Sequence, residues 1–260
     1  MRLGVIADIH GNAVALEAVL AALRHRGVAA VVNLGDLVSG PLWPAETLAL
    51  LREAGIASLR GNHDRWVAEG GGGASDRFAW DALTAEERAG LGALPVHLRP
   101  LPGVLAFHAR PDNDDAYLLE DVAGGRMVPA PVAEVAARLG PMAERLILCA
   151  HSHQAAIRQL PDGRVVVNPG SVGMPAYEDP TPPAHVSETG APHARFAVLE
   201  IEEERLLSAD LVAIAYDHQV AVARALANGS AKWARWLATG EAWDRARDGG
   251  GPGSTTTNPR

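Results

Sequence analysis

The first 60 residues alternate between strand-like and helix-like stretches, and this order strongly constrains the fold. Residues 2–7 and 29–34 are apolar runs without alternation, as in strands that are buried on both faces. Residues 13–26 place valines and leucines at helical spacing, residues 45–54 favour a second helix, and residues 56–59 form a third strand-like run. Strands joined by helices in this way pair in parallel through right-handed crossovers. We therefore expect the chain to begin with a parallel sheet covered by helices.

The later part of the chain favours antiparallel pairing. Residues 156–160 and 164–168 flank Pro161-Asp162-Gly163, which is a good hairpin signal. A second hairpin is predicted around the acidic turn at residues 202–204. The remaining predicted elements are strands at 96–99, 104–107, 145–149, 194–201 and 206–214, helices at 131–139 and 217–238, and a proline-rich loop at 180–192.

The stretch from Arg65 to Leu94 interrupts this order. It contains a four-glycine tract followed by a helix-like segment with large apolar residues. We interpret residues of about 65–95 as a helical insertion over the end of the sheet, either contacting a ligand or purely structural. The chain is otherwise expected to form one domain, residues 1–248. The tail at residues 249–260 is rich in Gly, Pro, Ser and Thr and is expected to be disordered.

The charge balance and the cysteine count narrow the classes of partner. The chain has 23 basic and 31 acidic residues, a formal charge of −8, which argues against a surface that coats nucleic acid. A small phosphorylated ligand stays compatible, because metal ions would supply local positive charge.

The only cysteine is Cys149, the N-terminus lacks the pattern of a secretory signal, and no apolar run approaches the ~18 residues of a membrane span. A cytoplasmic protein without membrane contact is expected.

Five short islands of Asp, His and Asn each follow an apolar run. Ligands gather at the carboxyl ends of strands in open sheets, so side chains from these islands should converge. Hard oxygen donors combined with imidazoles are what a cluster of divalent metals needs. Metal-dependent chemistry is therefore the leading hypothesis. The islands are Asp8-x-His10, Gly35-Asp36, Gly61-Asn62-His63-Asp64, His108 and His151-Ser152-His153.

Such a cluster could support hydrolysis of a phosphate ester. A carboxylate that bridges two cations lets them lie about 3.5–4 Å apart, and two cations can lower the pKa of a shared water towards ~7. They also neutralise charge on the phosphate oxygens. The leaving oxygen then needs a proton, which an imidazole that is not a ligand can donate near pH 7.

In order and spacing, the five islands resemble the motifs of the calcineurin-like metallophosphoesterase superfamily. Within it, the resemblance is to small bacterial and archaeal phosphodiesterase-like members and covers about residues 1–215. It extends to the segment Asn168-Pro169-Gly170-Ser171-Val172-Gly173. The fold that this resemblance implies is α+β, a two-sheet mixed β-sandwich flanked by helices in a four-layer α/β/β/α arrangement.

The resemblance also implies a role for each island. His63 would be the general acid on the leaving group, oriented by Asp64. The cofactor would be two divalent metal ions, with Mn²⁺ favoured and Fe, Zn or Ni as alternatives. The implied ligands are Asp8, His10 and His153 for the first metal, Asn62, His108 and His151 for the second, and Asp36 as a bridge between them.

Two further residues are candidate substrate contacts. Asn12 either caps the helix predicted at residues 13–26 or touches a substrate phosphate. Arg110 stands where the family commonly has a small hydroxyl residue. It either grips a phosphate bidentately or pairs on the surface with Asp112 or Asp114.

The function expected from the resemblance is hydrolysis of phosphodiesters by a metal-activated hydroxide, with a small phosphorylated substrate. A phosphomonoesterase or nucleotide phosphatase is the alternative activity. A non-catalytic interaction scaffold and a nuclease are alternatives of other classes. Homo-oligomerisation is left open. The segment after Asp36 lacks the Arg that Ser/Thr protein phosphatases and symmetrical dinucleoside tetraphosphatases carry there, which weakens both readings.

Overall fold

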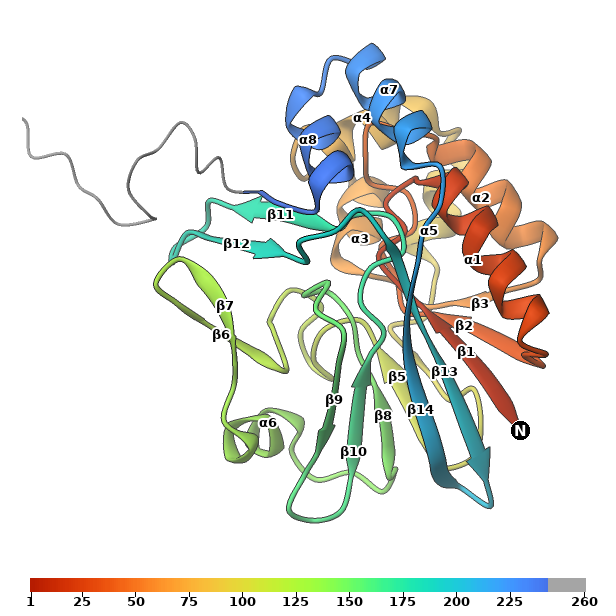
Figure 1. Ribbon diagram of the computed structural model, residues 1–260, viewed down its shortest axis with the longest axis vertical. Helices are drawn as coiled ribbons and strands as arrows, with labels where there is room; N and C mark the ends of the chain where they lie inside the picture. The colour runs from red at the N-terminus through yellow and green to blue at the C-terminus, as the bar shows by residue number, and fades with distance from the viewer. Residues whose placement is uncertain (243–260) are drawn as a thin grey trace, which may run out of the picture.

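The computed structural model describes residues 1–242, and two five-stranded sheets form its centre (Figure 1). In the first sheet, ordered β14-β13-β1-β2-β3, the three N-terminal strands pair in parallel as predicted. In the second, ordered β4-β5-β8-β10-β9, the three middle strands are parallel and both edge strands antiparallel. The strands are β1 Arg2–Ile6, β2 Ala30–Asn33, β3 Ala57–Ser58, β4 His97–Leu98, β5 Val104–Phe107, β8 Leu146–Leu148, β9 Ala156–Gln159, β10 Val165–Asn168, β13 Ala194–Glu202 and β14 Arg205–Ile214.

Apolar side chains from both sheets meet in the layer between them, where Val5, Leu146 and Leu199 are at most 1% exposed. Helices cover the two outer faces. α1 (Ala13–His25) and α2 (Pro44–Glu53) pack on the first sheet, and α6 (Val132–Leu139) packs on the second. This confirms the four-layer α/β/β/α arrangement and both predicted hairpins.

A third sheet of four short strands was not predicted. It contains β6 (Glu120–Ala123), β7 (Arg126–Pro129), β11 (Ala176–Asp179) and β12 (His185–Glu188), in the order β11-β12-β7-β6. β12 lies within residues 180–192, so the prediction of a loop throughout that stretch is wrong. The prolines of this stretch lie outside β12, so its backbone is free to pair with β11 and β7, and its first three residues are buried.

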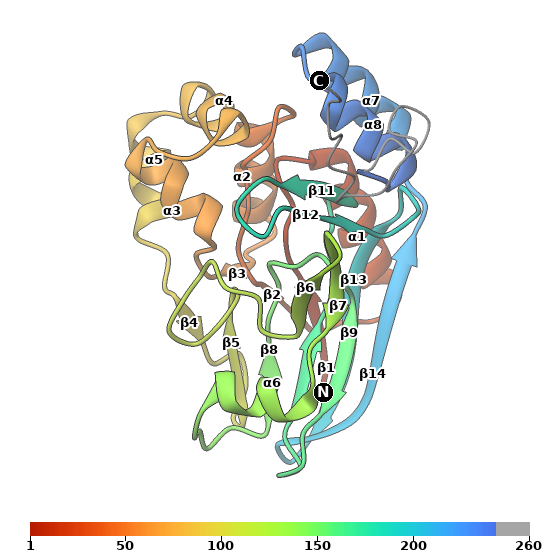
Figure 2. The same ribbon diagram turned by 90° about the vertical axis from the view of Figure 1, so that its left-hand side faces the viewer.

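Helical segments gather at one end of the sandwich (Figure 2). The insertion forms α3 (Asn62–Glu69), α4 (Ala74–Ala82) and α5 (Ala85–Gly92). The single helix predicted at 217–238 is instead a pair, α7 (His218–Ala227) and α8 (Ala231–Thr239), because Gly229 takes a left-handed φ of 78°. Within the described part of the chain, no helix has the length and apolar character that crossing a membrane requires. The predicted tail at 249–260 lies outside the described residues.

Candidate metal centre

The loops that follow β1 and β2 are joined by backbone hydrogen bonds. Asp8 N–H donates to the Gly35 carbonyl and His10 N–H to the Asp36 carbonyl, each at 3.0 Å. The backbone passes close to Gly35, since a Cβ there would lie 2.6 Å from the backbone nitrogen of Gly61. The polar islands of the first three strands are thereby held against one another.

Left-handed backbone conformations are concentrated in these loops. Among the described residues, seven that are not glycine have a positive φ, and five of them are predicted metal ligands. Each such conformation costs of the order of 1–3 kcal/mol, so it persists only where the surrounding structure enforces it. The clustering of strain marks this end of the sandwich as the functional one. The five are Asp8 (52°), His10 (52°), Asp36 (56°), His151 (69°) and His153 (61°).

Six of the seven predicted ligands form two clusters that could each hold a metal ion. Within each cluster the candidate donor atoms all lie within 4.8 Å of one another. Oδ2 of Asp36 is 3.3 Å from Nε2 of His108 and 3.8 Å from Nε2 of His10, so it faces both clusters. The clusters are Asp8, His10 and His153, and Asp36, His108 and His151.

Three of the histidines are oriented by backbone carbonyls. His10, His108 and His153 each have Nδ1 within hydrogen-bond distance of a carbonyl oxygen, which fixes Nδ1 as the donor and leaves Nε2 facing the site. This arrangement is typical of metal-binding histidines. The acceptors are the carbonyl oxygens of Ser39 (2.8 Å), Leu34 (2.7 Å) and Met174 (2.8 Å), respectively.

Several buried side-chain atoms that could bind a metal ion at the strand ends have no hydrogen-bond partner among the described residues. They are both carboxylate oxygens of Asp8 and Oδ1 of Asn62, while Nε2 of His108 faces the Asp36 carboxylate at 3.3 Å. Leaving a buried polar group unpaired costs free energy, and a buried carboxylate costs more. Oxygen and imidazole donors gathered around one space are the ligand types that divalent cations accept, so these residues fit the metal centre.

Burial also sets the protonation of the imidazoles. It lowers the pKa of His10 to about 4 and that of His151 to about 3, which keeps both rings neutral and able to bind a metal at pH 7. Burial acts in the same direction on His108, but the nearby carboxylate of Asp36 outweighs it and raises the pKa of His108 to about 10. Without a cation, a protonated His108 therefore partners Asp36.

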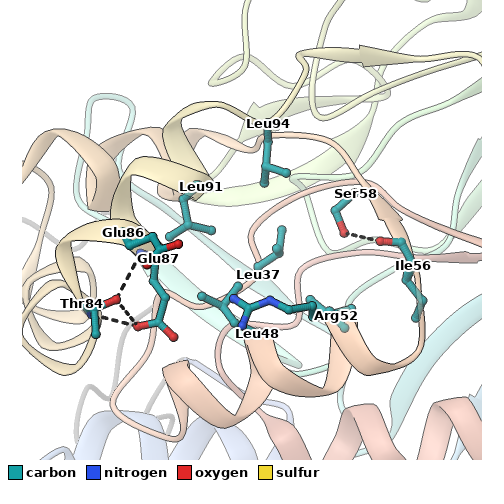
Figure 3. A pocket seen from close by; sticks show the side chains of 12 residues that line it. Leu37, Leu48, Arg52, Ile56, Ser58, Thr84, Glu86, Glu87, Leu91 and Leu94 are labelled. Carbon is teal, nitrogen blue, oxygen red and sulfur yellow. Dashed lines mark hydrogen bonds between the residues drawn. The ribbon is translucent and has the colours of Figure 1, made fainter.

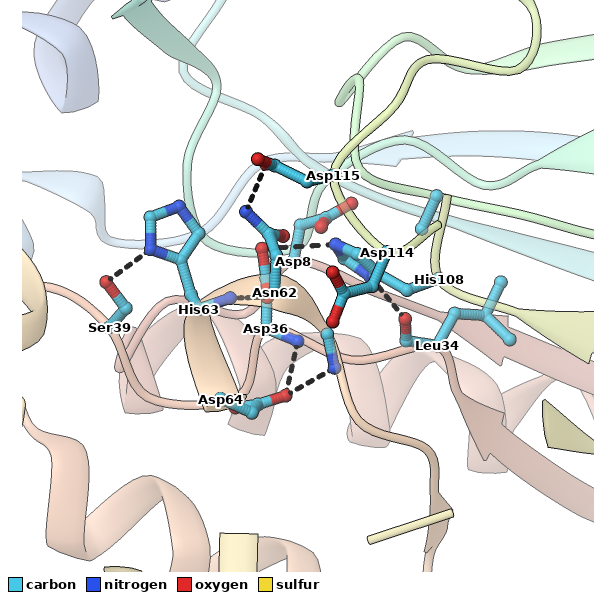
Figure 4. A network of polar contacts seen from close by, with 12 residues as sticks. Asp8, Leu34, Asp36, Ser39, Asn62, His63, Asp64, His108, Asp114 and Asp115 are labelled. Atoms are coloured by element: carbon cyan, nitrogen blue, oxygen red, sulfur yellow. Dashed lines mark hydrogen bonds and ion pairs between the residues drawn. The ribbon is translucent and has the colours of Figure 1, made fainter. Parts of the chain in front are cut away.

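His63 lies beside the clusters, and its imidazole is not among the atoms of either one (Figure 4). Its side chain is 28% exposed, and its Nδ1 lies 2.6 Å from Oδ1 of Asp76 in α4. Burial alone would lower the pKa of His63, but Asp36 and Asp76 outweigh it and raise the pKa to about 9. At neutral pH the ring is therefore protonated and able to act as an acid.

Asp64 does not orient His63, contrary to the prediction. Its carboxylate accepts hydrogen bonds from the backbone N–H groups of Asp36 (2.8 Å), Leu37 (2.9 Å) and Gly61 (3.0 Å). His63 and Asp64 are neighbours in the first turn of α3, and adjacent residues of a helix point in different directions. Asp64 therefore joins two of the site's loops, and Asp76 takes the position that was predicted for it.

Asn62 is oriented by a residue that the sequence did not single out. Its Nδ2 donates to Oδ1 of Asp115 at 3.1 Å, which leaves Oδ1 of Asn62 without a partner among the described residues and available to a metal ion. Next to it, Asp114 forms a bidentate ion pair with Arg65 at 2.7 and 2.8 Å. The run Asn113-Asp114-Asp115 was visible in the sequence, but nothing in its spacing linked it to Asn62.

The structure distinguishes between the two roles predicted for Asn12, a helix cap and a substrate contact. Its Oδ1 accepts from the Ala15 N–H as the cap of α1, and its Nδ2 donates to the Gly173 carbonyl and to the Tyr216 hydroxyl. The residue is completely buried. Its amide is thus used inside the protein, and the expected substrate contact does not fit the structure.

Arg110 takes neither of its expected partners. Its Nε donates to the Tyr117 carbonyl at 2.8 Å, and Asp114, one of the two expected partners, is bound by Arg65 instead. The guanidinium lines a small polar pocket together with His108. Arg110 is therefore placed beside the metal centre, on the side of the second cluster.

A separate hollow lies between α2 and α5 (Figure 3). Leucine and isoleucine side chains line it together with the polar residues Thr84, Glu86 and Glu87. None of the predicted site residues lines it. The chemistry of the molecule is therefore assigned to the strand ends and not to this hollow.

The sandwich and its strand-end clusters define a layered α/β protein with two candidate metal-binding clusters. The chain belongs to the calcineurin-like phosphoesterase superfamily, whose domain model matches residues 1–204. It is 26% identical over 250 residues to the protein MJ0912 of Methanocaldococcus jannaschii, covering 89% of this chain and 94% of that protein. The family is metal-dependent, which agrees with the two clusters.

Solved structures share the fold. A metallophosphoesterase from Sphaerobacter thermophilus has a TM-score of 0.70 and 23% identity, covering 93% of this chain and 100% of that one. The protein PH1004 from Pyrococcus horikoshii OT3 has a TM-score of 0.73 and 20% identity, covering 93% and 99%. These bacterial and archaeal structures confirm the fold that the sequence predicts.

Proposed function

We propose that this protein is a dinuclear metal-dependent phosphoesterase that hydrolyses small phosphodiesters, with His63 as the general acid. The observation that supports the proposal is the convergence of the unpartnered oxygens of Asp8 and Asn62 with the candidate ligand atoms of Asp36 and His108. His63 stands next to these atoms, and its imidazole is outside both clusters. Mn²⁺ is the favoured ion, and the same donors also accept Fe, Zn or Ni.

Each cluster holds one cation in this proposal. When bound, the two cations supply a water acidic enough to attack phosphorus at neutral pH and neutralise charge on the phosphate oxygens. Asp36 serves both clusters through Oδ2, while its Oδ1 accepts from the His63 backbone N–H at 3.0 Å. The ligands are Asp8, His10 and His153 in one cluster and Asn62, His108 and His151 in the other.

His63 donates the proton that the leaving group needs. Its ring is held on the Nδ1 side, so the Nε2 side is available to a substrate. With a pKa of about 9 the imidazolium is the major form at pH 7. As the phosphorus–oxygen bond breaks, the Nε2 proton passes to the departing oxygen, which leaves as an alcohol.

Charge around the site supports a diester substrate. Asp114 and Asp115 stand at the rim beside Asn62, and Arg65 is already paired with Asp114. A phosphomonoester carries close to two negative charges at pH 7, whereas a diester carries one. The additional charge would be repelled by the Asp115 carboxylate, so hydrolysis of monoesters or nucleotides is the second candidate.

The experiment is hydrolysis of bis-p-nitrophenyl phosphate and p-nitrophenyl phosphate by Mn²⁺-loaded protein, with His63→Ala as the paired variant. We expect a higher kcat/KM for the diester. In the variant we expect a large loss on a dialkyl phosphate, whose leaving oxygen needs a proton, and a smaller loss on the p-nitrophenyl esters. If neither ester is cleaved and the variant behaves like the parent protein, the scaffold alternative gains. Cleavage of oligonucleotides at physiological salt would favour the nuclease alternative.

A further inference from the structure

The side-chain partner of His63 comes from the helical insertion. Asp76 is the third residue of α4, and its side chain is 2% exposed. Its Oδ1 lies 2.6 Å from Nδ1 of His63, and its Oδ2 accepts from the Gly73 backbone N–H at 2.7 Å. The second contact caps α4. One carboxylate therefore ties the start of this helix to the imidazole.

A second segment meets the same ring atom. Oγ of Ser39, in the loop after β2, lies 3.2 Å from Nδ1 of His63 and also hydrogen-bonds with Asp76. Ser39 is 1% exposed. His63 is thus held on its Nδ1 side by a buried serine and a buried carboxylate from two different parts of the chain.

The C-terminal helices fasten α4 in place. Nε1–H of Trp233, in α8, donates to Oγ of Ser75 at 3.0 Å, and Ser75 directly precedes Asp76. The Trp233 side chain is buried in the cluster formed by α7, α8 and β11. α8 lies beyond residues 1–204, the part that matches the family domain, so this contact belongs to the C-terminal extension of the chain.

We propose that Asp76 is a positioning residue for His63 and that α8 fixes Asp76 through Ser75. The inference rests on the proposed function, in which His63 is the general acid. The carboxylate accepts the Nδ1–H, so that Nε2–H points away from α4 towards the leaving oxygen. After the Nε2 proton has left with the alcohol, the neutral ring keeps its Nδ1–H on Asp76.

The test compares Asp76→Asn with Glu87→Gln. Each variant removes a carboxylate charge but keeps an oxygen to cap its helix, and Glu87 caps α5 by accepting from the Thr84 N–H at 2.8 Å. For a dialkyl phosphate, we expect Asp76→Asn to lower kcat roughly 10- to 100-fold at unchanged KM, with Glu87→Gln like the parent protein. The loss should be smaller for bis-p-nitrophenyl phosphate, because p-nitrophenolate departs without a proton.

Equal activity of Asp76→Asn and the parent protein would overturn the positioning role. So would an equal loss on both substrates, which would indicate a general structural defect. If Asp76 acts through His63, adding Asp76→Asn to His63→Ala should cost no further activity. Multiplied losses in the double variant would contradict the inference.

Nitrogen NMR of histidine-labelled protein tests the contact without catalysis. The His63 signals are assigned by their absence in His63→Ala. We expect the Nδ1 signal to shift in Asp76→Asn, to shift less in Ser75→Ala, and to stay in place in Glu87→Gln. An unchanged Nδ1 signal in Asp76→Asn overturns the positioning role, whereas failure of the parent protein to hydrolyse any phosphoester contradicts the proposed function. The two failures are therefore distinguishable.

Discussion

Oδ2 of Asp36 lies 3.3 Å from Nε2 of His108, and each residue is at most 2% exposed. The two groups come from different sheets, Asp36 after β2 and His108 after β5. The same oxygen is 3.8 Å from Nε2 of His10, in the other cluster. One carboxylate thus stands where the two sheets and the two candidate metal positions meet.

Asp36→Asn should cost both metals and nearly all activity, since the change removes the charge that both clusters share. Metal content per chain, measured by inductively coupled plasma mass spectrometry, checks this. Asp81→Asn, which neutralises an exposed carboxylate of α4, serves as the control and should keep two metals. Retention of two metals in Asp36→Asn would show that Asp36 is not the bridge.

His63→Ala should keep both metals while lowering kcat on a dialkyl phosphate roughly 100- to 10,000-fold, the usual contribution of a general acid. The expectation follows from the placement of its imidazole outside both clusters and against Asp76. Metal content and kcat are measured on the same preparation. An empty site in this variant would mean that His63 is a ligand and that the assignment of roles is wrong.

Asp115→Ala should weaken binding of one metal by about 10-fold or more, because the Asn62 amide loses the partner that fixes its orientation. Asp112→Ala is the matched control, as it removes an exposed carboxylate from the same loop. Calorimetric titration of metal-stripped protein with Mn²⁺ measures both. Identical binding curves for the two variants would rule out this role of Asp115.

Glu120→Gln should stabilise the protein at pH 8 and change little at pH 4.5. Burial raises the pKa of Glu120 from 4.5 to about 7, so the folded protein holds an extra proton between these values and stability falls as pH rises through that range. The difference corresponds to at most about 3 kcal/mol. Urea denaturation at the two pH values measures it, and equal destabilisation at both would contradict the pKa shift.

The motif resemblance implied the sandwich, and the apolar runs predicted the buried strands and the convergence of the polar islands. Continuous apolar runs marked the buried strands, and parallel strands bring their carboxyl ends to one edge. Asp8, Asp36 and His108 directly follow such runs, so their meeting required only the topology. The left-handed backbone at the first two residues was not visible, because it depends on the loops packed around them.

The partners of these residues depend on contacts that sequence spacing does not encode. Asp76 reaches His63 because α4 folds back over the site, and in the sequence Asp76 resembles any capping carboxylate near a helix start. Asp64, next to His63 in the chain, was the natural local choice, yet the helical turn directs it elsewhere. The third sheet escaped notice because strands such as Glu120–Ala123 are short and charged.

The most direct test of a dinuclear phosphoesterase is the rate of bis-p-nitrophenyl phosphate hydrolysis as Mn²⁺ is added stepwise to metal-stripped protein. The two clusters around Asp36 predict activity that rises until two Mn²⁺ are bound per chain and then stays constant. Activity that is complete with one bound ion, or absent with two, would contradict the proposal.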